Sequence, residues 1–167
     1  LCLLIIWLPR LFNMLSLLTE DGSDLKDTEA RVKAIFILQR LVTDEPQEYK
    51  EQELAFNRIL TGCPFQVPLP KTLKLADYEI MTIESMIIGI KNNCEKFKNI
   101  SAKGFQLNFI ERPGRLEQRE DKWVLYVEGR SYDMLLDFLP WSYRLVQLPW
   151  LEKRINVVWR DKGEFDF

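Results

Sequence analysis

The sequence contains no histidine among its 167 residues. Histidine is the commonest general base, a usual ligand of zinc and haem, and the side chain that changes charge near neutral pH. Without histidine, any enzymatic chemistry would have to rely on carboxylates, lysine, tyrosine or cysteine.

Cysteine and glycine are also scarce. The three cysteines, Cys2, Cys63 and Cys94, are odd in number and widely spaced, with no Cys-x-x-Cys pair. This pattern argues against a disulfide framework and a zinc site, so we expect buried thiols in a reducing compartment. The glycines form no phosphate-binding loop, and there is no Gly-x-Ser-x-Gly elbow for a nucleophile. The sequence therefore predicts no cofactor, no metal and no enzymatic activity.

The chain has no large excess of positive or negative charge. The chain has 23 Lys and Arg against 25 Asp and Glu, which gives a net charge of −2. Arg112, Arg115 and Arg119 lie near aromatic residues, as in a nucleic-acid-binding strand pair, but interleaved acidic residues neutralise them. We expect no nucleic acid partner. With 47% apolar and 29% charged residues, the average composition is that of a soluble globular protein.

The apolar run at the start of the chain is too short to cross a membrane. Residues 1–8 (LCLLIIWL) are apolar, but a membrane span needs about 20 such residues, and Pro9 and Arg10 interrupt the run. The segment also lacks the basic start and small-residue cleavage site of a signal peptide. We expect no membrane contact in the assembled resting state. The opening is typical of a helix that packs in a protein core or at an oligomer interface, and we expect it to lie within a longer polypeptide.

Apolar residues at helical spacing dominate the first two-thirds of the chain. In the helix near residue 35 they should form one buried stripe that includes Ile35 and Gln39, and Gly62 is placed to cap the end of the next helix. The expected helices cover residues 11–18, about 27–42, 49–60 and 75–97, with a short one capped by Ser101.

The longest predicted helix carries an apolar seam with alternating intervals of three and four residues. This is the spacing of a helix that packs along a neighbour over its whole length. The seam consists of Ile80, Ile83, Ile87, Ile90, Cys94 and Phe97. Together with the opening helix, we interpret it as a self-association surface. The candidate residues are Leu4, Trp7, Leu11, Ile83, Ile87 and Ile90.

The sequence after Pro113-Gly114 alternates with the period of β-strands. Residues 115–120 and 123–128 predict a hairpin. Residues 131–139 fit one helical turn or an irregular strand, and 143–147 and 155–159 predict two more strands. The fold class is therefore α+β, with four to five helices followed by an antiparallel sheet of about four strands. We expect an entry or arm helix (1–18), a helical region (19–112), a β region (113–160) and a short tail (161–167), with 19–160 forming one domain.

The tripeptide Leu-Pro-Trp occurs twice in the β region, at 139–141 and 148–150. Proline fixes φ and lacks an amide donor, so each copy should stop a strand and present a large ring in a defined direction. Tryptophan is enriched at interface centres, although a core position is equally expected. The candidate docking surface consists of Pro140, Trp141, Pro149 and Trp150.

Acidic residues crowd the predicted hairpin and support one enzymatic alternative, a carboxylate-based glycan hydrolase. Such an enzyme needs two carboxyl groups about 5–10 Å apart, one of them desolvated. Asp133 and Asp137, four residues apart, could share one exposed side of a helix. Nothing in the sequence marks either as buried, so most of these acids should solvate strands and turns.

The chain resembles the carboxyl-terminal region of the tape measure proteins of contractile injection systems, which are particles similar to phage tails. The strongest similarity lies in WVLYVE, YDMLLDFLPW, QLPW and VVW, at residues 123–128, 132–141, 147–150 and 157–159. Weaker similarity covers residues 8–12, 38–43, 54–62 and 98–105, so the resemblance spans nearly the whole chain.

The resemblance implies a structural role without catalytic residues. The expected protein lies inside the inner tube during assembly, helps set the length of the tube, and docks near the hub and spike. Expected partners are further copies of itself, with a trimer favoured and a hexamer as the alternative, and the tube, hub and spike proteins. The protein would be in the cytoplasm during assembly of the particle, would then lie in the particle lumen, and would be released with the particle contents. A cargo or adaptor domain that grips effectors is the second hypothesis.

Overall fold

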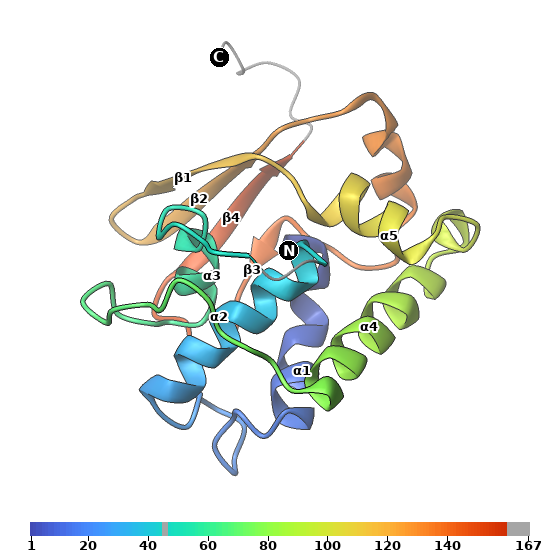
Figure 1. Cartoon of the computed structure of the whole chain (residues 1–167). Coiled ribbons are helices and arrows are strands. Elements are labelled where there is room, and N and C mark those ends of the chain that lie inside the picture. Colours follow the sequence, from blue (N-terminus) through green and yellow to red (C-terminus); the bar gives the residue numbers. More distant parts are fainter. Residues whose placement is uncertain (45–46, 160–167) are drawn as a thin grey trace.

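A computed structural model describes residues 1–44 and 47–159 of the chain. Helices occupy most of the first 110 residues and the strands follow, so the predicted α+β class is confirmed. Figure 1 shows the strands gathered on one side of the helices. The short tail predicted at 161–167 lies outside the described residues.

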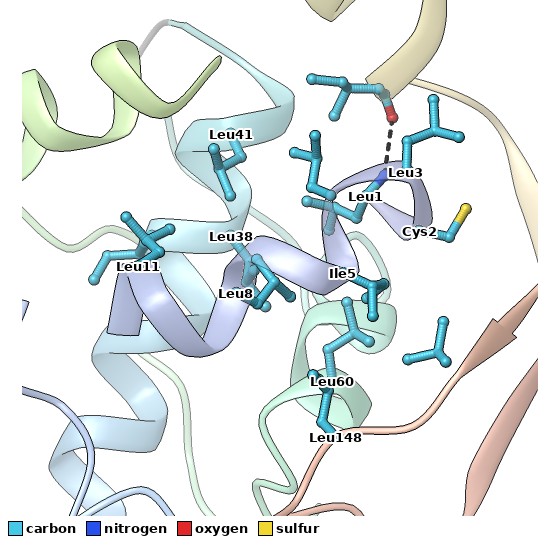
Figure 2. Close-up of a cluster of buried hydrophobic side chains, with 14 of the residues drawn as sticks. Leu1, Cys2, Leu3, Ile5, Leu8, Leu11, Leu38, Leu41, Leu60 and Leu148 are labelled. Carbon is cyan, nitrogen blue, oxygen red and sulfur yellow. Dashed lines mark hydrogen bonds between the residues drawn. The ribbon is translucent and has the colours of Figure 1, made fainter. Parts of the chain in front are cut away.

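The apolar opening forms a 3₁₀ helix, η1 (Cys2–Trp7), followed by α1 (Leu8–Met14). Pro9 lies in the first turn of α1, where its missing amide donor removes no helical hydrogen bond. The opening packs into the protein rather than extending from it as an arm, because Leu3, Leu4 and Leu8 are buried. Figure 2 shows this cluster, to which α1, α2, α3 and the loop after β3 contribute side chains.

Helix α2 (Thr28–Val42) begins where the sequence predicts. The Asp27 carboxylate accepts a hydrogen bond from the Ala30 amide at 2.8 Å and so caps the helix. The predicted single buried stripe is too narrow, since Ala34 and six of the next seven residues are buried. The cause is that α2 contacts α3, α4 and η3 together, and a helix apolar on most sides is a central one.

Helix α3 (Ala55–Leu60) is shorter than predicted. Residues 51–54 form turns, and the Tyr49 amide donates to the Lys71 carbonyl at 2.9 Å, which joins the two ends of a loop. Gly62 has a φ of +61° and its amide donates to the Ile59 carbonyl at 3.0 Å. This left-handed conformation after a helix suits glycine, so the predicted cap is confirmed.

Helix α4 (Asp77–Asn92) ends earlier than predicted, because Cys94 is extended and a separate 3₁₀ turn, η2 (Glu95–Phe97), follows it. The predicted seam faces the core. Ser101 caps α5 (Ala102–Phe105) by accepting a hydrogen bond from the Gly104 amide at 2.9 Å. A π-helical turn, η3 (Gln106–Ile110), follows directly. The rings of Phe97 and Phe105 lie 5.1 Å apart and join the end of the α4 region to α5.

Within the described residues, the strands form one sheet in the order β1-β2-β4-β3. The hairpin of β1 (Gly114–Gln118) and β2 (Lys122–Val127) is antiparallel, as predicted. β3 (Leu145–Val146) also pairs with β4 (Arg154–Trp159) in antiparallel fashion. However, β2 and β4 are parallel, so the prediction of an antiparallel sheet is wrong at its centre. A parallel pair needs a long crossover, which here contains the 3₁₀ helix η4 (Ser131–Phe138).

Candidate functional site

A hollow of about 500 Å³ lies between the helices and the β1–β2 face. Its walls are mainly apolar side chains and a buried amide pair, in which Asn57 Nδ2 donates to Gln39 Oε1 at 2.9 Å. Of the described residues that line it, Glu53 carries the one carboxylate, and that side chain is exposed. The hollow therefore lacks the desolvated carboxyl pair that a glycan hydrolase would need.

A cluster of polar groups surrounds Asp133, and two of its members, Arg112 and Trp159, also line this hollow. This carboxylate is fully buried and forms a bidentate ion pair with Arg112, whose side chain is also buried. Asp133 Oδ2 accepts two further hydrogen bonds, from the Arg130 amide at 2.8 Å and from Trp159 Nε1 at 2.9 Å. A buried charge is tolerated when it is paired and hydrogen-bonded in this way.

Three separate segments supply this cluster. Arg112 follows η3, Asp133 lies in the first turn of η4, and Trp159 ends β4. Arg112 also donates from Nε to the Asn108 carbonyl at 2.7 Å and from Nη1 to the Glu128 carbonyl at 3.0 Å. The cluster ties the helical half to the sheet.

The structure corrects two sequence interpretations of these residues. Asp133 does not share an exposed helix side with Asp137, because it points into the core while Asp137 is exposed. Arg112 does not belong to a surface basic patch. In the sequence, one feature points to the capping role of Asp133: it lies three residues after Arg130, the spacing at which a carboxylate accepts a hydrogen bond from the amide at a helix start.

A second buried carboxylate, Glu79, lies at the start of α4. Its side chain forms an ion pair with Lys33 of α2 at 2.5 Å and accepts a hydrogen bond from the Ala76 amide at 2.7 Å. The hydrogen bond from Lys33 to Glu79 raises the pKa of the lysine. Glu79 is thus engaged in fixing α4 against α2, as Asp133 is in fixing the sheet.

The residues predicted for self-association are largely internal. Leu4, Leu11, Ile83, Ile87 and Ile90 are all buried within the single chain. The seam of α4 packs against the chain's own core, so these five side chains are not a free surface. Trp7, the sixth candidate, is partly buried, and its ring meets Trp141 edge-on with centroids 4.4 Å apart.

The two Leu-Pro-Trp turns also point their rings inward. Trp150 is buried, its Nε1 donates to the Leu60 carbonyl at 2.9 Å, and its ring lies 5.6 Å from Phe12. Trp150 therefore occupies a core position, which is one of the two positions that the sequence allows for it. Trp141 is partly buried and donates to the Leu3 carbonyl at 3.0 Å. What the turns expose is Pro140 and Pro149.

The three cysteines are buried and free, as predicted. Burial raises the pKa of the Cys2 and Cys63 thiols, which keeps them protonated and unreactive at neutral pH. In the part of the chain that the structure describes, no group of three or more His, Cys, Asp or Glu residues is arranged to hold a metal ion. Nor does any helix there have the length and apolar character needed to cross a membrane.

The chain is an α+β module in which buried ion pairs and aromatic contacts join the helical part to the sheet. Comparison with known protein families matches residues 1–159 to the contractile injection system tape measure proteins. The chain belongs to this family, which is structural; its members lie in the lumen of the particle tube and interact with other particle proteins. No curated protein and no solved structure gave a significant match.

Proposed function

We propose that this chain is the carboxyl-terminal, non-enzymatic domain of a tape measure protein, which helps set inner tube length and docks near the hub and spike. The observation that carries the proposal is the family match over residues 1–159. The structure supports it because the buried charges Asp133 and Glu79 are each engaged in joining elements of the fold. Such a module supplies a rigid shape for docking.

The domain acts as more than one copy, as a trimer that matches a three-fold hub or as a hexamer. It assembles in the cytoplasm, lies within the lumen of the finished particle and leaves with the particle contents on firing. Its contacts are with the tube, hub and spike proteins. This arrangement requires a surface for self-contact, and the buried α4 seam does not provide it.

Docking is tested by co-purification. The full tape measure protein, tagged and co-expressed with tube, hub and spike proteins, is expected to retain the hub or spike, and removal of residues 1–159 should abolish that retention. The tube protein serves as an internal comparison, because contacts made by other parts of the tape measure protein would persist. Equal retention of hub and spike by the shortened protein would contradict the docking proposal.

A cargo or adaptor role is the second candidate, and the exposure of Pro140 beside the partly exposed Trp141 favours it. In that role, Trp141→Ala should abolish effector loading while tube length stays unchanged. A length defect with normal loading would favour the tape measure role instead. Trp150 is unsuitable for this test, since its substitution would disturb the core.

A further inference from the structure

Strand β1 lies at one edge of the sheet, and no other strand of the described residues pairs with its outer side (Figure 1). The Glu128 amide donates to the Pro113 carbonyl at 3.0 Å, at the start of the β1–β2 ladder. Because hydrogen-bonded pairs alternate along an antiparallel ladder, every second residue of β1 directs its N–H and C=O away from β2. These residues are Gly114, Leu116 and Gln118. Such a row of backbone groups can accept another strand.

The 500 Å³ hollow lies beside this edge. Gly114 and Leu116 line it on the sheet side, and Gln52 and Glu53 line it on the helical side. Gly114, Gln52 and Glu53 are exposed, so the hollow opens to solvent between the two sides. Its interior is mainly apolar, with Phe56 among the partly buried side chains. Since side chains alternate along a strand, a strand added to β1 would direct every second side chain into this space.

Two buried amide side chains in the wall of the hollow each keep one polar atom unpaired. Asn57 Nδ2 donates to Gln39 Oε1, but among the described residues Asn57 Oδ1 has no donor and Gln39 Nε2 has no acceptor. Asn57 and Gln39 are only 2% and 8% exposed. Buried polar groups normally find partners. A free acceptor next to a free donor therefore suits a peptide group, or an amide or hydroxyl side chain, which offers both functions.

The first residue of the chain lies in the wall of the same hollow. Leu1 and Ile110 both line it, and the Leu1 nitrogen is buried at 3.4 Å from the Ile110 carbonyl oxygen (Figure 2). A peptide N–H fits this position, whereas a charged ammonium would lose its hydration there. Any residue joined to the Leu1 nitrogen has to lie next to Ile110, and hence at the hollow.

The direction of such a segment follows from the two ends of β1. Gly114, at the start of β1, lines the hollow together with Leu1, whereas Gln118, at the other end, does not. A segment that follows the free edge and ends at Leu1 therefore passes Gln118 first, then Leu116, and runs opposite to β1. This is the antiparallel arrangement, which continues the pattern of the β1–β2 hairpin.

We propose that the polypeptide preceding Leu1 in the tape measure protein adds an antiparallel strand to the free edge of β1 and buries alternate side chains in the hollow. Its inward side chains are apolar, apart from one uncharged polar group that meets Asn57 and Gln39. The inference rests on the proposed function, in which this chain is the carboxyl-terminal domain and further polypeptide precedes it. The added strand holds the domain in a fixed orientation on that polypeptide.

Hydrogen exchange in the full tape measure protein, followed by mass spectrometry, tests the pairing. The comparison is a full protein in which the ~10 residues before Leu1, the upper range of strand length, are replaced by glycine and serine. Exchange of the Leu116 amide should be at least ~10-fold faster after the replacement, because its hydrogen-bond partner is lost. The Glu117 amide is the internal control, since it pairs within the hairpin in both proteins.

Three results overturn the inference. The Leu116 amide can exchange rapidly in both proteins, or slowly in both, and either result means that the preceding segment does not cover the edge. Protection that appears only when tube, hub or spike protein is added assigns the edge to another protein. Retention of hub or spike by a protein with an unprotected Leu116 amide would still uphold docking, so the two proposals fail separately.

Gln118→Pro tests the ladder from the side of β1. Proline removes an amide that points away from β2, which an edge strand tolerates, and Gln118 is exposed. In the full protein this variant should speed exchange of the Leu116 amide at least ~3-fold relative to the matched control Gln118→Ala, because only proline deletes a hydrogen bond to the added strand. After the glycine–serine replacement, both variants should exchange alike. Equal exchange of the two variants in the full protein contradicts the pairing.

Discussion

Asp133→Ala is expected to lower the free energy of unfolding by about 3–5 kcal/mol, because it leaves the buried Arg112 guanidinium without its carboxylate. The substitution also removes the acceptor for Trp159 Nε1 and for the Arg130 amide. Urea denaturation followed by circular dichroism measures the change. A loss of this size would account for a large share of the stability of an ordinary domain.

Two further variants separate the ion pair from the packing around it. Asp133→Asn keeps the shape and part of the hydrogen bonding, so it should cost less than alanine. Arg112→Met combined with Asp133→Ala removes both charges, and the double variant should be more stable than Asp133→Ala alone. If Asp133→Ala unfolds at the wild-type urea concentration, the cluster does not join the two halves of the protein.

Trp150→Ala is expected to destabilise the protein by about 3–5 kcal/mol, the usual cost of removing a large aromatic side chain from a packed core. The indole is buried against Phe12 and donates its N–H to the Leu60 carbonyl at 2.9 Å. Thermal and urea unfolding of the purified variant measure the loss. Trp150→Phe keeps most of the ring but deletes the donor, so it should isolate a hydrogen-bond contribution of about 1–3 kcal/mol.

Trp141→Ala is the matched comparison, because it alters the other Leu-Pro-Trp turn. Its ring is only partly buried, so the loss of stability should be clearly smaller than for Trp150. A Trp150 variant that is fully stable yet fails to bind a particle protein would contradict the core assignment. It would restore Trp150 to the docking surface.

The elements that could be predicted from the sequence are those set by local patterns. Asp27 and Ser101 begin helices, Gly62 ends one, and the β1–β2 hairpin follows from period-two alternation. The seam of α4 was also correctly identified as a packing surface. Each of these signals acts between residues close in the chain, so it is visible without knowledge of the fold.

What could not be predicted depends on distant contacts. The parallel pairing of β2 with β4 depends on the path of the crossover through η4, which strand patterns do not specify. The pairing of Arg112 with Asp133 spans 21 residues, and neither residue has a local sign of burial. Periodicity shows that a helix face is packed, but it does not say whether the partner belongs to the same chain. The spacing of the α4 seam is therefore equally compatible with self-association and with packing inside the chain.

Inner tube length in assembled particles tests most directly the claim that this chain is a structural module of a tape measure protein. Electron microscopy would compare particles whose full tape measure protein carries either Asp133→Ala with Trp150→Ala, which disrupts the module, or Met134→Glu, which alters only its surface. We expect the disrupted module to yield few tubes or tubes without a defined length, while the surface variant keeps the wild-type length distribution. Tubes of normal, uniform length built with the disrupted module would contradict it.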